Sequence, residues 1–167
     1  MSDKPEKPLV SMFVDELGDM YDAEKRLIHA MPKMIERVRS AALRDELQKH
    51  AEQARLQLER LERVFELMNA RPVRKNCNAM AGLLSEGECL LAEDTPEAVR
   101  DSTILAIAQK IEHYEIATYV TLREWAQQLG KIEVSGLLQQ TLDEEVASDE
   151  KLSQFALTLN NKAAHAA

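Results

Sequence analysis

Apolar residues recur at alternating steps of four and three along four long stretches of the chain. That spacing places them on one face of an α-helix, so each stretch is predicted to form an amphipathic helix. The predicted helices cover about residues 9–39, 43–70, 96–129 and 132–160. Pro32 lies inside the first of them, but the apolar spacing continues beyond it, so we expect a kink rather than an end.

The connections between these helices differ in length. Short turns follow the first helix and the third, and Gly130 suits the residue that ends the third. The longer segment 71–95 joins the second helix to the third and is predicted to carry a short helix at about 79–93. Thr95 before Pro96 is typical of an N-cap followed by a first-turn proline.

One long crossover between two helical hairpins predicts an all-α fold, a ferritin-like four-helix bundle with up-down-down-up order. The crossover would carry the short helix. We expect residues 9–160 to form the bundle, with a flexible N-terminal tail at 1–8 and a frayed C-terminal tail at 161–167.

Polar residues interrupt the apolar face of each helix only near its centre. In the first, third and fourth helices the interrupting charges are Glu24, Glu115 and Glu145. The second helix has instead an imidazole and an amide on that face, from His50 and Gln57. Polar residues at these central positions would face one another inside the bundle.

The two hairpins are related by a shift of 91 residues, which carries Glu24 onto Glu115 and the apolar face of the second helix onto that of the fourth. This shift equals thirteen heptads, so the apolar faces of the two hairpins would match in phase even without a true repeat. The shared polar centre does not follow from phase. It predicts that the polar residues of all four helices lie at one level.

Composition narrows the function classes. Charged residues make up 30% of the 167 positions, and 29 acids against 21 Lys and Arg give a net charge of −8. Nucleic acid is an unexpected partner, because phosphates attract clustered Lys and Arg. We expect no membrane partner and a cytoplasmic location, since no long apolar run or signal pattern is present. Cys77 and Cys89 suit reduced thiols.

Buried glutamates are costly unless they are paired, protonated or bound to a cation. Oxygen ligands together with one or two imidazoles suit iron or manganese. Di-metal carboxylate bundles place glutamates from two helices beside a Glu-x-x-His pair from each of the other two. Here neither the second helix nor the fourth contains Glu-x-x-His, so the predicted site is carboxylate-rich and asymmetric.

Several stretches resemble the YciE/YciF family of bacterial stress proteins over about residues 9–160. They include "LGDMYDAEKRLIHAMPKM", "CNAMAGLLSEGE" and "AQKIEHYEIATYVTLREWAQQLG". The resemblance implies a ferritin-like bundle, a homodimer and a candidate ferroxidase. The metal ligands it implies are Glu24 in "DAEK", His50 opening "HAEQ", Glu112 and Glu115 in "EHYE", and Glu144 and Glu145 in "DEEV". Gln53 stands where the family often has Glu, and it completes the candidate set.

Two functions remain open at this point. One is a di-metal oxidoreductase that oxidises ferrous iron with dioxygen or peroxide, with iron as the expected metal and manganese or zinc as alternatives. The other is a non-catalytic dimeric scaffold, in which the polar layer only fixes helix register through hydrogen bonds.

Overall fold

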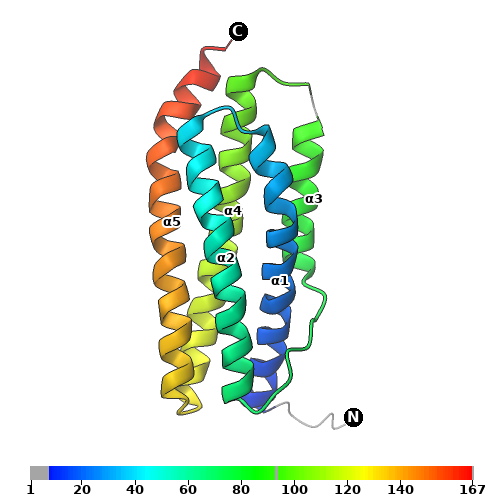
Figure 1. Ribbon diagram of the computed structural model, residues 1–167, viewed down its shortest axis with the longest axis vertical. Helices are drawn as coiled ribbons and strands as arrows, with labels where there is room; N and C mark the ends of the chain where they lie inside the picture. The colour runs from blue at the N-terminus through cyan, green and yellow to red at the C-terminus, as the bar shows by residue number, and fades with distance from the viewer. Residues whose placement is uncertain (1–7, 93, 167) are drawn as a thin grey trace, which may run out of the picture.

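The computed structural model describes residues 8–92 and 94–166. Five helices follow one another along the chain: α1 (Leu9–Arg37), α2 (Ala41–Leu67), α3 (Asn78–Ala92), α4 (Glu97–Gln128) and α5 (Ile132–Ala164). Figure 1 shows α1 and α5 running in one direction and α2 and α4 in the other, with α3 beside α1 on the long crossover. The expected all-α bundle and its up-down-down-up order are therefore confirmed.

The helix ends follow local chemistry, and the start of α4 differs from the sequence expectation. The Ser40 side chain accepts a hydrogen bond from the Leu43 N–H at 3.4 Å and caps α2. Gly130 has φ +68°, as the residue after a helix often requires. Pro96, rather than Thr95, occupies the N-cap of α4, and no side chain caps that end.

The C-terminal helix is longer than expected. It continues to Ala164 instead of ending near Asn160, because residues 161–164 contain no helix breaker. Most of the expected frayed tail is therefore helical, and Ala167 lies outside the described residues. Residues 1–7 of the expected N-terminal tail and Glu93 of the expected crossover helix also lie outside them.

The core is formed by the apolar faces of the four long helices. α1 passes through Pro32 without ending and buries its face from Phe13 to Met34. Near the C-terminal end of α2, Tyr21 and Phe65 meet edge to face with ring centroids 5.9 Å apart. Among the described helices, none combines the length and the apolar character needed to cross a lipid bilayer.

Contacts around Gly18 and Asp22 fasten the crossover to α1. A side chain at Gly18 would bring its Cβ to 2.7 Å from the Val73 carbonyl oxygen, so only glycine admits this close approach. One turn further on, the buried Asp22 carboxylate accepts the Cys77 N–H at 2.8 Å and pairs with Arg26 and Arg74. These contacts hold α3 alongside the bundle.

A buried carboxylate of α4 closes the turn between α1 and α2. The two oxygens of Asp101 accept the N–H groups of Arg39 at 2.8 Å and Ser40 at 2.7 Å. Asp101→Ala would leave both donors without this partner, and we expect it to lower the free energy of unfolding by roughly 1–3 kcal/mol. Urea unfolding measures the loss. The control Glu59→Ala changes an exposed side chain of α2 and should leave stability within about 0.5 kcal/mol, so similar losses in both variants would contradict this account.

Candidate metal centre

The polar centres of the four long helices meet at one level of the core. α1 supplies Glu24, α2 supplies His50, α4 supplies Glu112 and Glu115, and α5 supplies Glu145. All five side chains are buried, and those of Glu24, Glu115 and Glu145 are fully enclosed. Each lies here because its position falls on, or beside, the apolar face that its helix turns inward.

Four of these residues form a compact group. One ligand atom each from His50, Glu112, Glu115 and Glu145 can be chosen so that all four atoms lie within 4.8 Å of one another. The His50 imidazole joins the group on both sides: Nδ1 lies 3.1 Å from Glu112 Oε1, and Nε2 lies 3.9 Å from Glu115 Oε2. A single cation could therefore contact one imidazole nitrogen of α2 and carboxylate oxygens of α4 and α5.

Ser148 orients the α4 side of the group. Its hydroxyl donates to Glu112 Oε1 at 2.6 Å and lies 3.4 Å from His50 Nδ1. Ser148 follows Glu145 by three residues, so both side chains lie on the inward face of α5. It occupies the place at which a Glu-x-x-His motif would have its histidine.

Glu24 extends the group toward α1. It does not belong to the compact set of four, but its charge interacts with those of Glu145 and Glu115. The Tyr119 hydroxyl donates to Glu24 Oε1 at 2.6 Å and fixes the carboxylate. With Glu24 included, all four long helices contribute to one carboxylate-rich centre.

Glu145 is held from α2. The amide of Gln57 donates to Glu145 Oε1 and, at 3.2 Å, to Glu144 Oε2. Glu144 itself forms a two-pronged ion pair with Arg60, at 2.9 and 3.0 Å, and its side chain is 25% exposed. Gln57 therefore links the buried carboxylate to an ion pair at the edge of the bundle.

The structure thus separates the seven predicted ligands. It brings together His50, Glu112, Glu115 and Glu145, and it places Glu24 beside them. Glu144 lies at the edge, on Arg60, while Gln53 is half-buried on α2 and outside the group of four. His113, the neighbour of Glu112, is exposed and lies 3.2 Å from Asp149.

Two supporting residues were not anticipated from the sequence. Tyr119 follows Glu115 by four positions and so shares its face of α4, but a tyrosine at such a position is equally typical of a packing residue. Arg60 follows Gln57 by three positions, and that spacing was the signal available for it. Neither residue type identifies a metal site by itself.

Burial and mutual repulsion shift the pKa values of the centre. Burial, followed by the charge of Glu145, raises the pKa of Glu24 to about 8. Burial and then interaction with Glu145 raise the pKa of Glu112 to about 10. Glu115 is also raised well above the usual pKa of a glutamate, by burial and by three neighbouring carboxylates, whereas burial lowers the pKa of His50. At neutral pH the centre therefore retains protons that a cation could displace.

Several carboxylate oxygens of the centre have no hydrogen-bond partner, and this bears on whether the residues suit a metal. Within the described part of the chain, both oxygens of Glu115 and one each of Glu24, Glu112 and Glu145 are buried without a hydrogen-bond partner. Buried polar atoms are normally satisfied, and such a concentration of exceptions requires an explanation. Oxygen ligands with one neutral imidazole are a donor set that fits iron or manganese.

Comparison with known proteins identifies the family of the chain. The family described as "Domain of unknown function (DUF892)" matches residues 9–165. Protein YciF of Escherichia coli K12 is 38% identical over 159 residues, which is 95% of this chain and 96% of YciF.

Two solved structures support the same relationship. That of the E. coli stress protein YciF matches with a TM-score of 0.90, at 38% identity, over 94% of this chain and 99% of that one. YcfI from Rhodopseudomonas palustris matches with a TM-score of 0.87, at 36% identity, over 92% and 98% of the two chains. The protein therefore belongs to the DUF892 family and is a YciF-like helical bundle, as the sequence motifs predicted.

Proposed function

We propose that the carboxylate-rich centre binds two iron ions and oxidises ferrous iron, with dioxygen or peroxide as the electron acceptor. The relation to the E. coli stress protein YciF supports placing this activity in a bacterial stress response. Ferrous iron is the substrate in this proposal, and manganese or zinc could occupy the same ligands.

The observation that carries the proposal is the set of buried, unpartnered carboxylate oxygens that converge from all four long helices. Glu115 has both oxygens without a partner in the described chain and interacts with Glu24, Glu112 and Glu145, so we assign it as the bridging ligand. His50 and Glu112 would complete one ion site, and Glu24 and Glu145 the other. On binding, the carboxyl groups of Glu24, Glu112 and Glu115 would give up their protons, and the positive charge of the ions would offset the repulsion among the carboxylates.

The reaction balances with two ferrous ions. Each loses one electron, and the two electrons with two protons reduce dioxygen to hydrogen peroxide. With peroxide as acceptor, two electrons and two protons yield two water molecules instead. The carboxyl groups of Glu24 and Glu112 hold protons at neutral pH and would supply these two, while the Tyr119 and Ser148 hydroxyls keep the two carboxyl groups in place by hydrogen bonds.

The scaffold function remains the second candidate because a hydrogen-bonded layer does exist. Gln57 joins α2 to α5, Tyr119 joins α4 to α1, and Ser148 joins α5 to α4. Such a layer can fix helix register without any metal. It leaves the five unpartnered carboxylate oxygens unexplained, which favours the metal site.

Metal titration followed by exposure to air tests the proposal. Metal-free protein receives ferrous iron without oxygen, and bound iron is counted after gel filtration. We expect two ions per chain, followed by rapid appearance of ferric absorbance when oxygenated buffer is mixed in. Binding without faster oxidation than in buffer would reject the oxidoreductase. No retained iron would favour the scaffold.

A further inference from the structure

The metal centre is closed to solvent, so any oxidant must cross part of the protein. His50 is 4% exposed, Glu112 is 2% exposed, and Glu115 and Glu145 are 0% exposed. A substrate of the centre therefore needs either an existing passage or a side chain that moves.

A small cavity of about 10 Å³ borders the centre on one side. His50 and Glu112 form its polar wall, and its other walls are apolar, formed by Leu27, Met31, Met34, Leu47, Ala108 and Ile111. A space of this size holds about one molecule as small as water. The apolar walls offer no hydrogen bond to such a molecule, except at the metal ligands themselves.

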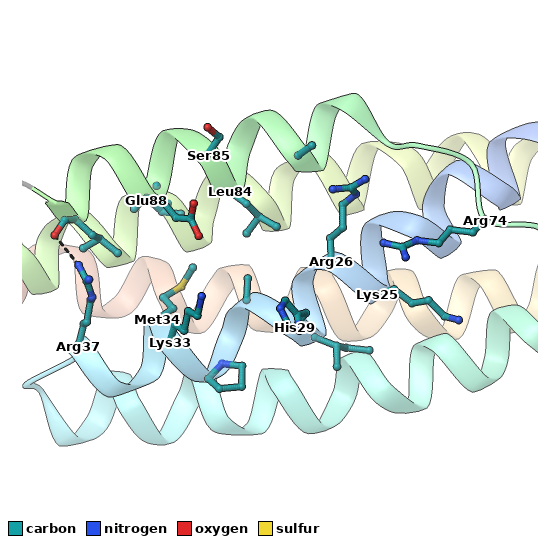
Figure 2. A pocket seen from close by; sticks show the side chains of 17 residues that line it. Lys25, Arg26, His29, Lys33, Met34, Arg37, Arg74, Leu84, Ser85 and Glu88 are labelled. Atoms are coloured by element: carbon teal, nitrogen blue, oxygen red, sulfur yellow. Dashed lines mark hydrogen bonds between the residues drawn. The ribbon is translucent and has the colours of Figure 1, made fainter.

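A large surface groove lies outside this cavity, between α1 and α3. It has a volume of about 1090 Å³, and its walls include Leu84 and Glu88 of α3 and Lys33 and Met34 of α1. Figure 2 shows Met34 of α1 lying across from Leu84 and Glu88. The groove brings solvent close to the outer side of the small cavity.

Met34 belongs to the walls of both spaces. Its side chain is 7% exposed, so it lies at the boundary between groove and interior. Methionine is unbranched and rotates about three side-chain bonds, which makes it easier to displace than Leu or Ile. A change of Met34 rotamer would therefore join the groove to the cavity beside His50 and Glu112.

The charges of the groove select what can use this passage. Five cationic side chains line it, from Lys25, Arg26, Lys33, Arg37 and Arg74, against one lining carboxylate, Glu88. Asp22 pairs with Arg26 and Arg74, so the excess of positive charge comes from the other three. Ferrous ions would be repelled there, and a bare ion would also lose its hydration in the apolar cavity. Hydrogen peroxide would lose its hydrogen bonds in the same cavity, whereas dioxygen has none to lose.

We propose that the groove, Met34 and the small cavity form the entry path for dioxygen, with Met34 as its gate, and that iron reaches the centre by another route. This proposal rests on the proposed function and deepens it, because it selects dioxygen over peroxide as the acceptor. Met34 is a positioning residue here: it controls access and is not itself a ligand.

Dissolved dioxygen is paramagnetic, so its presence inside the protein can be measured without iron or turnover. Metal-free full-length protein with ¹³C-labelled methionine methyl groups is compared under nitrogen and under oxygen pressure by NMR. We expect the Met31 and Met34 methyl signals to relax faster under oxygen than those of Met20 and Met80. The last two are fully buried but line neither space, so they are matched controls. Equal oxygen effects at all four methyl groups would overturn the path.

Substitution of Met34 gives the second measurement. Met34→Phe should slow oxidation of bound iron by dioxygen roughly threefold or more, because the stiffer side chain opens less often. The rate with added peroxide and the affinity for Mn²⁺ should stay unchanged. Met12→Phe is the matched control on an exposed part of α1.

The two proposals fail separately. Enhanced relaxation at Met31 without any iron oxidation would reject the oxidoreductase and support the passage. Rapid oxidation at an unchanged rate in both Met34→Phe and Met34→Ala would reject the passage and keep the oxidoreductase. Met34→Ala also covers the case in which the phenyl ring does not fit, since the smaller side chain should raise the rate with dioxygen.

Discussion

Glu115→Gln should lower metal affinity by at least about two orders of magnitude, since losing a group that only orients a ligand already costs roughly 10- to 100-fold. Glu115 is fully buried, has two unpartnered oxygens within the described chain and interacts with Glu24, Glu112 and Glu145. The glutamine keeps the size of the side chain, but its neutral amide has no negative charge with which to bridge two cations. Titration calorimetry with Mn²⁺, which avoids oxidation, measures the change.

The same substitutions at exposed residues separate the loss of a metal ligand from a general effect on the fold. Glu59→Gln makes the same chemical change on the exposed face of α2 and should leave the affinity for Mn²⁺ unaltered. His50→Ala should weaken binding strongly, whereas His113→Ala removes an exposed imidazole and should not. Wild-type affinity in both Glu115→Gln and His50→Ala would show that the centre is not the metal site.

The helices and the level of the site could be predicted from sequence because both depend on the period of the apolar pattern. A glutamate such as Glu24 or Glu145, in the middle of an otherwise apolar face, can only point into the core once its helix packs. The same reasoning placed Glu115 and His50 correctly. Burial of these side chains follows from position along the chain, without knowledge of tertiary contacts.

The exact membership of the site could not be predicted in that way. Glu144 and Glu145 are adjacent, and the pattern does not show that Arg60 reaches across from α2 to hold the first of them at the edge. Gln53 lies one position off the inward face of α2 and remains outside the group of four. These outcomes depend on side-chain reach between helices, which sequence spacing within one helix does not encode.

The internal repeat explains the asymmetry of the centre. The 91-residue shift relates Glu24 to Glu115, but it relates His50 to Thr141 and Ala54 to Glu145. The second hairpin therefore contributes three carboxylates to the centre, and the first contributes one carboxylate and the imidazole. Two ion sites built from these residues would be unequal, so we expect one stronger and one weaker binding step.

The raised pKa values predict that the metal-free protein loses stability as the pH rises. The unfolded chain releases the proton of a glutamate near pH 4.3, whereas the folded protein holds that of Glu24 to about pH 8 and that of Glu112 to about pH 10. Between these values the folded state binds more protons than the unfolded state. The free energy of unfolding then falls with increasing pH, by roughly 1 kcal/mol per pH unit for each such carboxyl group.

His50 acts in the opposite direction, so the pH range must be chosen accordingly. Burial lowers its pKa, and the unfolded chain therefore binds more protons at this histidine below about pH 6.5. That contribution raises stability as the pH increases toward 6.5 and is constant above it. A comparison between about pH 7 and about pH 8 isolates the carboxyl groups.

Bound metal should remove this loss, because it takes the deprotonated ligands and competes with their protons. We expect the melting temperature of the metal-free protein to fall by several degrees from about pH 7 to about pH 8, since about 1 kcal/mol corresponds to roughly 2–4 °C in a chain of this size. With saturating Mn²⁺ the fall should vanish or reverse. Circular dichroism melting curves at both pH values, with and without Mn²⁺, measure this.

Metal-free Glu115→Gln should melt no lower than the wild-type protein at about pH 8, because one buried acid is gone. If that variant instead melts lower at both pH values and Mn²⁺ changes nothing, Glu115 is a structural residue and the bundle is a scaffold.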